Sequence, residues 1–464
     1  MSFPRYLEYK DSGVKWLGQV PVHWGIRPLK YVATYNDEVM PEGTPNDYPI
    51  KYVEISDVDE QLGITGWTEY PFASAPSRAR RVLKDGDVLI STVRTYLRAI
   101  APVTEPPDGL VGSTGFAVIR PVPYIYHSAL LGYVIRAEWF ISSIISRSTG
   151  VSYPAINASD LVALSLPVPP WKDQQTIATF LDHETAKIDT LIHEQKRLIE
   201  LLKEKRQAVI SHAVTKGLNP DVPMKDSGVE WLGEVPTHWI VSQLKFNTLE
   251  MQTGPFGSQL HAEDYVEGGI PLINPAHMIE GLIFPDPQVS VDEATWLRLK
   301  RHSLAAGDII LARRGELGRC AIISEEQDGW LCGTGSLKAK LTSRIDPEYA
   351  YLLISSKGVV SELSLESKGS TMQNLNTETL GRVKLPIPPL WEQKKILNYI
   401  HEVSGQYASL ISTAQSANKL ISERRSALIS AAVTGKIDIR DWQPPMVESA
   451  FNKEVRQAGL EAEA

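Results

Sequence analysis

Residues 10–24 read Lys10-Asp11-Ser12-Gly13-Val14-Lys15-Trp16-Leu17-Gly18-Gln19-Val20-Pro21-Val22-His23-Trp24. Nearly the same stretch returns as Lys225-Asp226-Ser227-Gly228-Val229-Glu230-Trp231-Leu232-Gly233-Glu234-Val235-Pro236-Thr237-His238-Trp239. A second motif, Leu166-Pro167-Val168-Pro169-Pro170 with Asp173-Gln174, returns as Leu385-Pro386-Ile387-Pro388-Pro389 with Glu392-Gln393. Self-similarity at a fixed spacing indicates a duplicated structural unit. Because the interiors of the two copies differ, we expect them to do one job at two different places.

A long helix is predicted after the Pro-Pro pair of each copy. Apolar residues recur at alternating spacings of four and three from Ile177 onward, and again from Ile396 onward. A 3.5-residue periodicity sustained over about five heptads predicts coiled-coil helices. The residues predicted to pair the helices are Ile177, Leu181, Ile188, Leu191, Leu198 and Leu202 in the first helix, and Ile396, Ile400, Leu410, Ile421 and Leu428 in the second.

The sequence before each helix predicts a mixed α/β domain, because short apolar runs such as residues 86–91 and 307–312 alternate with turn signals. The predicted fold class is therefore α+β. Two mixed α/β domains are separated by two long helices, which run antiparallel if their seams pair, in a pseudo-twofold internal repeat. The predicted boundaries are 1–168 for the first domain, 169–217 for the first helix, 218–387 for the second domain, 388–436 for the second helix and 437–464 for a C-terminal tail.

Composition places the chain among ordinary globular proteins. It has 464 residues, of which 43% are hydrophobic and 22% charged. No apolar run approaches the roughly 18 residues of a membrane span, and the first residues lack the apolar core of a signal peptide. We therefore expect a cytoplasmic protein without a membrane segment. Cys320 and Cys332 are too few for a disulfide framework or a zinc site, so we expect buried, inert thiols and no bound metal.

Local charge differs from net charge. The formal net charge of −8 argues against a nucleic-acid partner, because phosphate neutralisation needs Lys and Arg. However, residues 78–98 contain six basic residues against two acidic ones, and the matching stretch 298–319 contains the same numbers. Each copy therefore carries a local positive excess at an equivalent place.

Catalytic motifs are not found in the sequence. No Gly-rich phosphate loop with its Lys-Ser/Thr is present, so ATP binding by this chain is not expected. Residues 274–277, Asn-Pro-Ala-His, lack the second proline and the aromatic residue that a base-amino methyltransferase needs. His23 and His238 lie in a repeated Pro-x-His-Trp turn, and a catalytic His would need a nucleophile or carboxylate repeated beside it. A turn packed by tryptophans is the simpler interpretation, and the chain is predicted not to be an enzyme.

Together these motifs resemble the specificity subunit of type I restriction-modification systems. The resemblance rests on both repeated motifs, on Gly-Asp-Val-Leu and Gly-Asp-Ile-Ile inside the domains, and on residues 433–437 at the end of the second helix. It covers residues 1–440. In that family, residues 1–168 and 218–387 would be target-recognition domains, and the two helices would be spacers that set the length of unread DNA.

The resemblance also implies partners and cofactors. Each target-recognition domain would read one half of a bipartite site in double-stranded DNA. Two modification subunits would dock on the chain and methylate adenine N6, and restriction subunits would add translocation and cleavage. S-adenosylmethionine, ATP and Mg would then bind to those partner subunits, and this chain would bind no cofactor. The main alternative is a protein-only adaptor without DNA readout; a fused nuclease-methyltransferase lacks the necessary motifs.

The residues that contact DNA are predicted on physical grounds, since arginine reads guanine edges bidentately and holds phosphates. The alternative for each arginine is a solvated surface or an internal ion pair, and for the polar residues a simple turn. The loops after residues 91 and 312 are unlike, which predicts an asymmetric target. The predicted DNA-binding residues are Arg80, Arg81, Arg94, Arg98, Ser152, Tyr153, Arg301, Arg313, Arg314, Arg319, Gln373 and Asn374.

Overall fold

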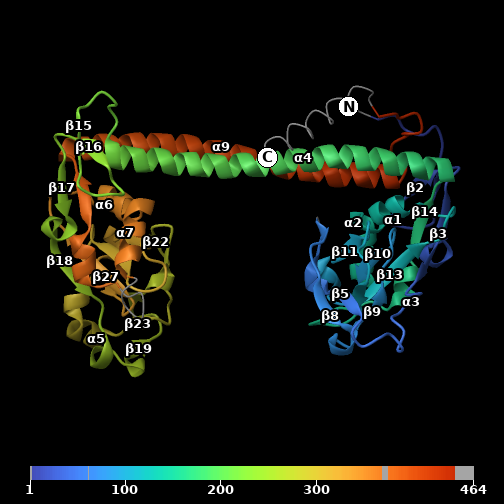
Figure 1. Cartoon of the computed structure of the whole chain (residues 1–464), viewed down its shortest axis with the longest axis horizontal. Coiled ribbons are helices and arrows are strands. Elements are labelled where there is room, and N and C mark those ends of the chain that lie inside the picture. Colours follow the sequence, from blue (N-terminus) through green and yellow to red (C-terminus); the bar gives the residue numbers. More distant parts are fainter. Residues whose placement is uncertain (1–2, 61, 368–374, 445–464) are drawn as a thin grey trace. The chain divides into compact units, whose positions relative to one another are not determined.

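The computed structural model describes residues 3–60, 62–367 and 375–444, and the chain divides into two compact units (Figure 1). Unit 1 comprises residues 1–196 and 416–464, and unit 2 comprises residues 197–415. The two long helices are α4 (Trp171–Lys216) and α9 (Leu390–Val433), which lie inside the bounds predicted for them. Each unit contains one globular domain and half of each long helix. The compact units therefore differ from the linear division that the sequence suggested.

Both units are built around a four-stranded antiparallel sheet with the same strand order. The order is β11-β10-β13-β4 in unit 1 and β25-β24-β27-β18 in unit 2. All four residues of β10 and of β24 are buried, which explains why the two Gly-Asp motifs lead into uninterrupted apolar runs. The strands are β4 (Ala33–Tyr35), β10 (Val88–Ser91), β11 (Ile100–Pro102) and β13 (Phe116–Pro121), and β18 (Thr248–Thr253), β24 (Ile309–Ala312), β25 (Cys320–Ile322) and β27 (Ser336–Leu341).

The second four-stranded sheet has diverged between the units. Its order is β8-β5-β12-β9 in unit 1 and β19-β23-β20-β26 in unit 2. The run β8-β5-β12, one antiparallel and one parallel pair, corresponds to β23-β20-β26, whereas β9 and β19 have no matching strand in the part of the chain that the structure describes. In unit 1, β9 pairs with β12 over several residues. Unit 2 has a single β-bridge between Ser303 and Leu331 at that place, and it also has helix α5 (Glu293–Arg298). The strands are β5 (Pro49–Val53), β8 (Thr68–Pro71), β9 (Ala79–Val82) and β12 (Leu110–Ser113), and β19 (Tyr265–Val266), β20 (Ile270–Ile273), β23 (Ser290–Val291) and β26 (Leu331–Cys332).

Two-stranded ribbons and short helices complete each unit, again in matched pairs. The ribbons of unit 1 are β1 (Tyr9–Asp11) with β2 (Gln19–Pro21), β3 (Gly25–Pro28) with β14 (Ser165–Val168), and β6 (Val58–Asp59) with β7 (Gly63–Ile64). Those of unit 2 are β15 (Met224–Asp226) with β16 (Glu234–Pro236), β17 (Ile240–Gln243) with β28 (Lys384–Ile387), and β21 (Met278–Ile279) with β22 (Leu282–Ile283). The short helices are α1 (Ser128–Ile135), α2 (Glu138–Arg147) and α3 (Ala158–Val162), and α6 (Pro347–Ile354), α7 (Lys357–Ser367) and α8 (Thr377–Arg382).

The repeated Lys-Asp-Ser-Gly motif forms the turn of a hairpin in each unit. The Gly13 amide donates to Asp11 Oδ1 at 3.0 Å, and the Gly228 amide donates to Asp226 Oδ1 at 2.9 Å. Both glycines have positive φ, 69° and 65°, a conformation that costs glycine little and other residues more. The motif is therefore repeated because the same left-handed turn is built twice.

The Pro-x-His-Trp turn is the joint between the globular domain and the long helices. In unit 1, Trp24 is fully buried, and the end of α9 packs on the turn at Gly435, where a Cβ would lie 2.4 Å from Pro21 Cδ. In unit 2, Trp239 is fully buried, and a Cβ on Gly217, after the end of α4, would lie 3.2 Å from its ring. The turn in each unit thus meets the end of one long helix.

A buried glutamine fixes the start of each long helix. Gln174 Nε2 donates to the carbonyls of Ile125 (3.0 Å) and Pro169 (2.9 Å), and its Oε1 accepts from the His127 amide (2.8 Å). Gln393 makes the same three bonds, to the Arg344 and Pro388 carbonyls and from the Asp346 amide, at 2.8 to 2.9 Å. A buried amide must be satisfied in this way, because an unpaired one costs free energy.

The long helices pair antiparallel inside each unit, as the sequence predicted. In unit 1, Asp189 of α4 accepts two bonds from Arg425 of α9, at 2.7 and 3.1 Å, and Ile177 shares a core cluster with Ile429. In unit 2, Ile199 of α4 clusters with Ile411 and Ala414 of α9. Figure 1 shows the two helices side by side within each unit.

The predicted seam is wrong at three positions. The structure buries Ile177, Leu181, Ile188, Ile396 and Ile400, half-buries Leu202, Ile421 and Leu428, and exposes Leu191, Leu198 and Leu410. The neighbours of the exposed residues, Ile192, Ile199 and Ile411, are the ones turned inward.

The cause of the error is the phase of the helix. An α-helix drifts by about 20° per heptad against a strict 3.5-residue repeat. The drift is about 40° after two heptads and about 60° after three, so the heptad position turns progressively away from the inward face and the next residue along the chain turns toward it. The buried residues Ile177, Ile188 and Ile199 accordingly recur every eleven residues. An eleven-residue repeat matches the natural helical period more closely than a heptad does.

No single helix within the described ranges has the length and apolar character to cross a membrane. Helices α1 and α2 meet those requirements only when they are taken together across a bend of 61°. They supply Leu131, Val134 and Phe140 to the core of unit 1, where all three are buried.

Replacing Gln174 with alanine should lower the free energy of unfolding of unit 1 by about 3 kcal/mol, because three backbone groups lose their buried partner. The adjacent Gln175 is exposed, so Gln175→Ala is the matched control and should change stability by less than about 0.5 kcal/mol. Urea denaturation followed by tryptophan fluorescence measures both values. Equal effects of the two variants would contradict the role given to Gln174.

The helix seam is tested by two neighbouring residues. Ile199 is 8% exposed and Leu198 is 43% exposed. Ile199→Ala should destabilise the protein by about 2 kcal/mol through lost burial and the cavity left behind, and Leu198→Ala by less than about 1 kcal/mol. The urea midpoints of the two variants are compared. A larger loss of stability for Leu198→Ala would mean that the strict heptad prediction is right and that Leu198 faces the partner helix.

Candidate nucleic-acid interface

Three segments of unit 1 meet beyond the end of β10. The first is the loop of residues 92–99, here named the β10–β11 loop. The Thr92 amide donates to the Gly115 carbonyl (2.9 Å), and the Ile156 amide donates to the Thr92 carbonyl (2.9 Å). Val93 also forms a β-bridge with Ala155. Backbone bonds therefore hold the β10–β11 loop between the turn at residues 112–115 and the segment of residues 149–156.

Unit 2 builds the same junction from different side chains. The loop of residues 313–319 is named the β24–β25 loop. The Arg313 amide donates to the Gly335 carbonyl (2.8 Å), and the Leu375 amide donates to the Arg313 carbonyl (2.8 Å). These bonds match those of Thr92 in unit 1, so the backbone frame is duplicated while the side chains on it are not.

The junction in unit 1 displays a basic and aromatic surface. Arg94 is exposed, and its guanidinium lies 4.9 Å from the ring centre of Tyr153. Tyr153, Ser152 and Tyr96 are also exposed. The structure therefore brings together Arg94, Ser152 and Tyr153, which the sequence had placed far apart. An arginine held over an aromatic ring keeps its donor groups directed outward and loses little freedom on binding.

The other arginines predicted for unit 1 are partly engaged within the domain. Arg80 lies over the Phe72 ring at 5.3 Å and donates to the Ala79 carbonyl. Arg81 is half-buried, its Nε has no hydrogen-bond partner among the described residues, and burial lowers its pKa. Arg98 forms ion pairs with Glu138 and Glu60. Arg98 was predicted as a DNA contact, with an internal ion pair as the alternative, and the structure shows that ion pair.

In unit 2, Arg314 is the exposed arginine at the tip of the β24–β25 loop. Arg313 is half-buried and donates to the Leu375 carbonyl at 3.1 Å, and burial with the nearby Arg314 charge lowers its pKa. Arg319 pairs with Glu316 and donates to the Pro275 carbonyl at 3.2 Å. Arg301 is exposed on a short 3₁₀ helix, residues 300–302. Gln373 and Asn374 lie outside the described residues.

The sequence analysis missed exposed residues that stand beside the predicted ones. Tyr96 and Leu97 of the β10–β11 loop and Val151 of the adjoining segment are exposed large side chains. The available signal was the position of Tyr96 and Leu97 between Arg94 and Arg98, in a stretch without helix or strand periodicity. Exposed apolar side chains gathered at one loop junction are typical of a binding surface.

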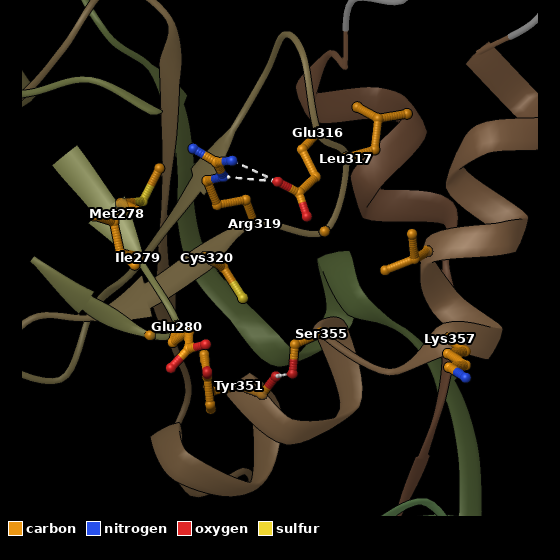
Figure 2. Close-up of a pocket in the computed structure, with 13 residues that line it drawn as sticks. Met278, Ile279, Glu280, Glu316, Leu317, Arg319, Cys320, Tyr351, Ser355 and Lys357 are labelled. Carbon is orange, nitrogen blue, oxygen red and sulfur yellow. Dashed lines mark hydrogen bonds and ion pairs between the residues drawn. The ribbon is translucent and has the colours of Figure 1, made fainter. Parts of the chain in front are cut away.

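A cavity of about 500 Å³ opens beside the β24–β25 loop, between hairpin β21–β22 and helices α6 and α7 (Figure 2). Glu280 lines it from the hairpin, Arg319 and Cys320 from the loop and β25, Tyr351 from α6 and Lys357 from α7. Burial raises the pKa of Tyr351, and the negative charge of the nearby Glu280 adds to that effect.

The repeated histidines do have carboxylate partners, contrary to the sequence analysis. His23 Nε2 lies 3.1 Å from Asp173 Oδ2, and His238 Nε2 lies 2.7 Å from Glu392 Oε2. Each acid stands in the first turn of a long helix, so the pair fastens the Pro-x-His-Trp turn to the helix start. No serine or cysteine hydroxyl or thiol bonds to either histidine in the described part of the chain. The pair is a structural tether.

A family model described as type I restriction modification DNA specificity domain matches residues 77–201 and 252–416. The chain belongs to this family. The two matched segments contain the two loop junctions described above, one in each unit, so the specificity domain occurs twice in the chain.

Relatives and solved structures agree with this assignment. The chain is 22% identical over 456 residues to the type I restriction enzyme MjaIX specificity subunit of Methanocaldococcus jannaschii, covering 94% of this chain and 97% of the relative. It is 22% identical to the EcoKI specificity subunit of Escherichia coli, over 69% of this chain and 68% of that one. The fold is similar to that of the HsdS subunit from Thermoanaerobacter tengcongensis (TM-score 0.50, 22% identity, 90% of this chain and 98% of that chain). It is also similar to a chain solved for the assembly and conformational transition of the type I R-M system (TM-score 0.63, 22% identity, 89% and 98%).

The two cysteines are buried, as predicted, and report on the integrity of unit 2. Burial raises the pKa of Cys320 to about 12 and that of Cys332 to about 12, so the reactive thiolate is scarce at neutral pH. Ellman's reagent should therefore modify neither thiol in the native protein within minutes, and both after denaturation. Rapid labelling of Cys320 in the folded chain would show that the adjacent cavity opens to its sulfur.

Proposed function

We propose that this chain is the DNA specificity subunit of a type I restriction-modification complex, in which each unit reads one half of an asymmetric bipartite site. The observation that carries the proposal is the duplicated junction: one backbone frame, built twice, exposes arginine on unlike loops. Membership of the specificity-domain family supports it. A chain that holds two equivalent frames with different side chains is suited to reading two different short sequences.

Arg94 and Arg314 are the first candidates for contact with DNA. Both are exposed at loop tips, whereas the neighbouring arginines are bound to protein groups. Arginine donates two parallel hydrogen bonds to guanine O6 and N7 in the major groove, or to phosphate oxygens. Tyr153 beside Arg94 adds an aromatic surface for sugar or base contact. Exposed arginines on the two loops are compatible with DNA binding by a chain of net charge −8, because only the surface that contacts DNA has to be positive.

The proposed half-sites differ because the loops differ. The β10–β11 loop presents Arg94, Tyr96 and Leu97, and the β24–β25 loop presents Arg314, Gly315 and Glu316. A glutamate on one loop only would repel phosphate and accept a hydrogen bond from cytosine N4. The two surfaces are not interchangeable, so a palindromic target is not expected.

In this proposal the chain supplies no chemistry of its own and acts as a scaffold. Modification subunits would bring S-adenosylmethionine and methylate adenine N6, and restriction subunits would bring ATP and Mg. The two units repeat exposed residues as well as buried ones. This supports the docking of one modification subunit on each unit. Tyr31 and Phe246 occupy matched positions, both are exposed, and each has the preceding lysine over its ring, at 5.3 and 5.1 Å.

The adaptor without DNA readout is the alternative. It would use the same repeated surfaces for proteins and leave the arginines solvated. The two proposals differ in salt dependence. A DNA-reading complex should lose affinity steeply as salt rises, because each neutralised phosphate releases counterions, and an adaptor should show no such DNA affinity.

Base-resolution methylation sequencing tests the proposal. Cells carrying the cognate modification subunit, with and without this chain, should differ by one N6-methyladenine motif in two separated, unlike halves. A second strain with the two loops exchanged between the units should methylate an altered motif. A palindromic motif would overturn the asymmetry, and unchanged methylation by a complex shown to assemble would favour the adaptor.

A further inference from the structure

Arg98 connects three elements of unit 1. Its Nη1 and Nη2 bond to the two carboxylate oxygens of Glu138, each at 2.8 Å, and its Nη1 also bonds to Glu60 Oε1 at 3.0 Å. Glu138 is the first residue of α2, and Glu60 lies in the hairpin between β6 and β7. Arg98 itself is the C-cap residue that follows the short 3₁₀ helix Thr95–Leu97 in the β10–β11 loop.

The β10–β11 loop is held at Thr95 and Arg98, with the exposed Tyr96 and Leu97 between these residues and the exposed Arg94 directly before them. Thr95 is buried and its Oγ1 lies 2.8 Å from Ser148 Oγ. Arg98 forms the second anchor. Arg94 and Arg98 both have left-handed backbone conformations, with φ of 51° and 53°, which arginine adopts only when its surroundings require it. The loop therefore has one defined shape, and that shape sets the positions of Arg94, Tyr96 and Leu97.

Unit 2 does without this anchor. Gly318 stands two residues before β25, where Arg98 stands two residues before β11, and Lys357 opens α7 where Glu138 opens α2. The cavity of Figure 2 occupies the corresponding place, with Lys357 and Glu280 on its walls. The shared frame thus folds without the Arg98 network, so the network serves something particular to unit 1.

Stability is a poor explanation for the network. The side chains of Glu138 and Glu60 are 60% and 49% exposed, and exposed ion pairs contribute little to folding. A bidentate arginine-carboxylate pair does fix geometry, because two parallel bonds define both distance and orientation. The Arg98 network therefore fixes the position of the β10–β11 loop and adds little stability.

We infer that Arg98 is a positioning residue for half-site recognition: it does not contact DNA, and it holds the β10–β11 loop so that Arg94 meets a phosphate and the neighbouring side chains meet the bases of the first half-site. The inference rests on the proposed function. It also replaces the sequence-based prediction of Arg98 as a DNA contact, because three of its five N–H groups are bonded to Glu60 and Glu138, and the charges of these two carboxylates repel phosphate.

Arg94 and Arg98 make a matched pair of arginines for the test. The full chain, assembled with its modification subunits, is titrated at several salt concentrations with a duplex carrying the methylated motif. Arg94→Gln should lower the slope of log K against log salt by about 0.9, the loss of one phosphate contact. Arg98→Gln should leave the slope unchanged, weaken binding about tenfold, comparable to one mismatched base pair, and reduce discrimination only against mismatches in the first half-site.

The charge-swapped variant Arg98→Glu with Glu138→Arg, combined with Glu60→Gln so that no carboxylate faces the new one, provides the rescue. It rebuilds the pair with the charges reversed, so binding should return to within about threefold of the unaltered complex, and thermal melting of all variants checks that unit 1 is folded. A slope lowered by about one unit in Arg98→Gln, or weaker binding by the swapped variant than by Arg98→Gln, would show direct phosphate contact and overturn the inference. Absence of sequence-selective binding by the unaltered complex would instead overturn the proposed function.

Discussion

The side-chain amides of Gln174 and Gln393 fix where each long helix starts, and the rest of each unit depends on that starting point. Each amide ties the start of a long helix to a carbonyl and an amide of the globular domain, in a place closed to water. The Pro-x-His-Trp turn adds a second fastening, through His23 to Asp173 and His238 to Glu392, and receives the end of the other helix. Because both helix ends meet at one turn, the motifs that repeat in the sequence are the ones that make this joint.

The antiparallel direction of the two long helices also decides which of their faces meet in the seam. Once α4 and α9 leave their joints antiparallel, their inward faces are set by the natural period of the helix rather than by a heptad. The buried isoleucines at 177, 188 and 199 follow an eleven-residue repeat, and Asp189 finds Arg425 across the seam. Branched and polar residues at these points fix one register, since slippage would separate the ion pair and expose the isoleucines.

A rigid frame of this kind allows the recognition loops to differ. The backbone bonds of Thr92 and Ile156 in unit 1, and of Arg313 and Leu375 in unit 2, build the same junction without involving the side chains that face outward. Each loop is then shaped by its own interactions. Arg98 reaches two neighbouring elements in unit 1, whereas Arg319 in unit 2 bonds within its loop and to Pro275, leaving a cavity alongside. Recognition can therefore diverge in one unit while the other keeps its shape.

The sequence by itself determined the duplication, the two long helices, their antiparallel pairing, the buried cysteines and the family, because these depend on local spacing and on motifs that recur intact. It could not determine the phase of the seam beyond two heptads, since a small angular drift accumulates along the helix. Nor could it separate Arg94 and Arg314, which are exposed, from Arg98 and Arg319, which are bound to carboxylates. Arg94 and Arg98 stand in one loop and Arg314 and Arg319 in the other, so their places in the chain do not distinguish them. Glu138 lies forty positions after Arg98 in the chain, and only the tertiary structure brings the two together. An arginine is available to DNA only where no such partner packs against it.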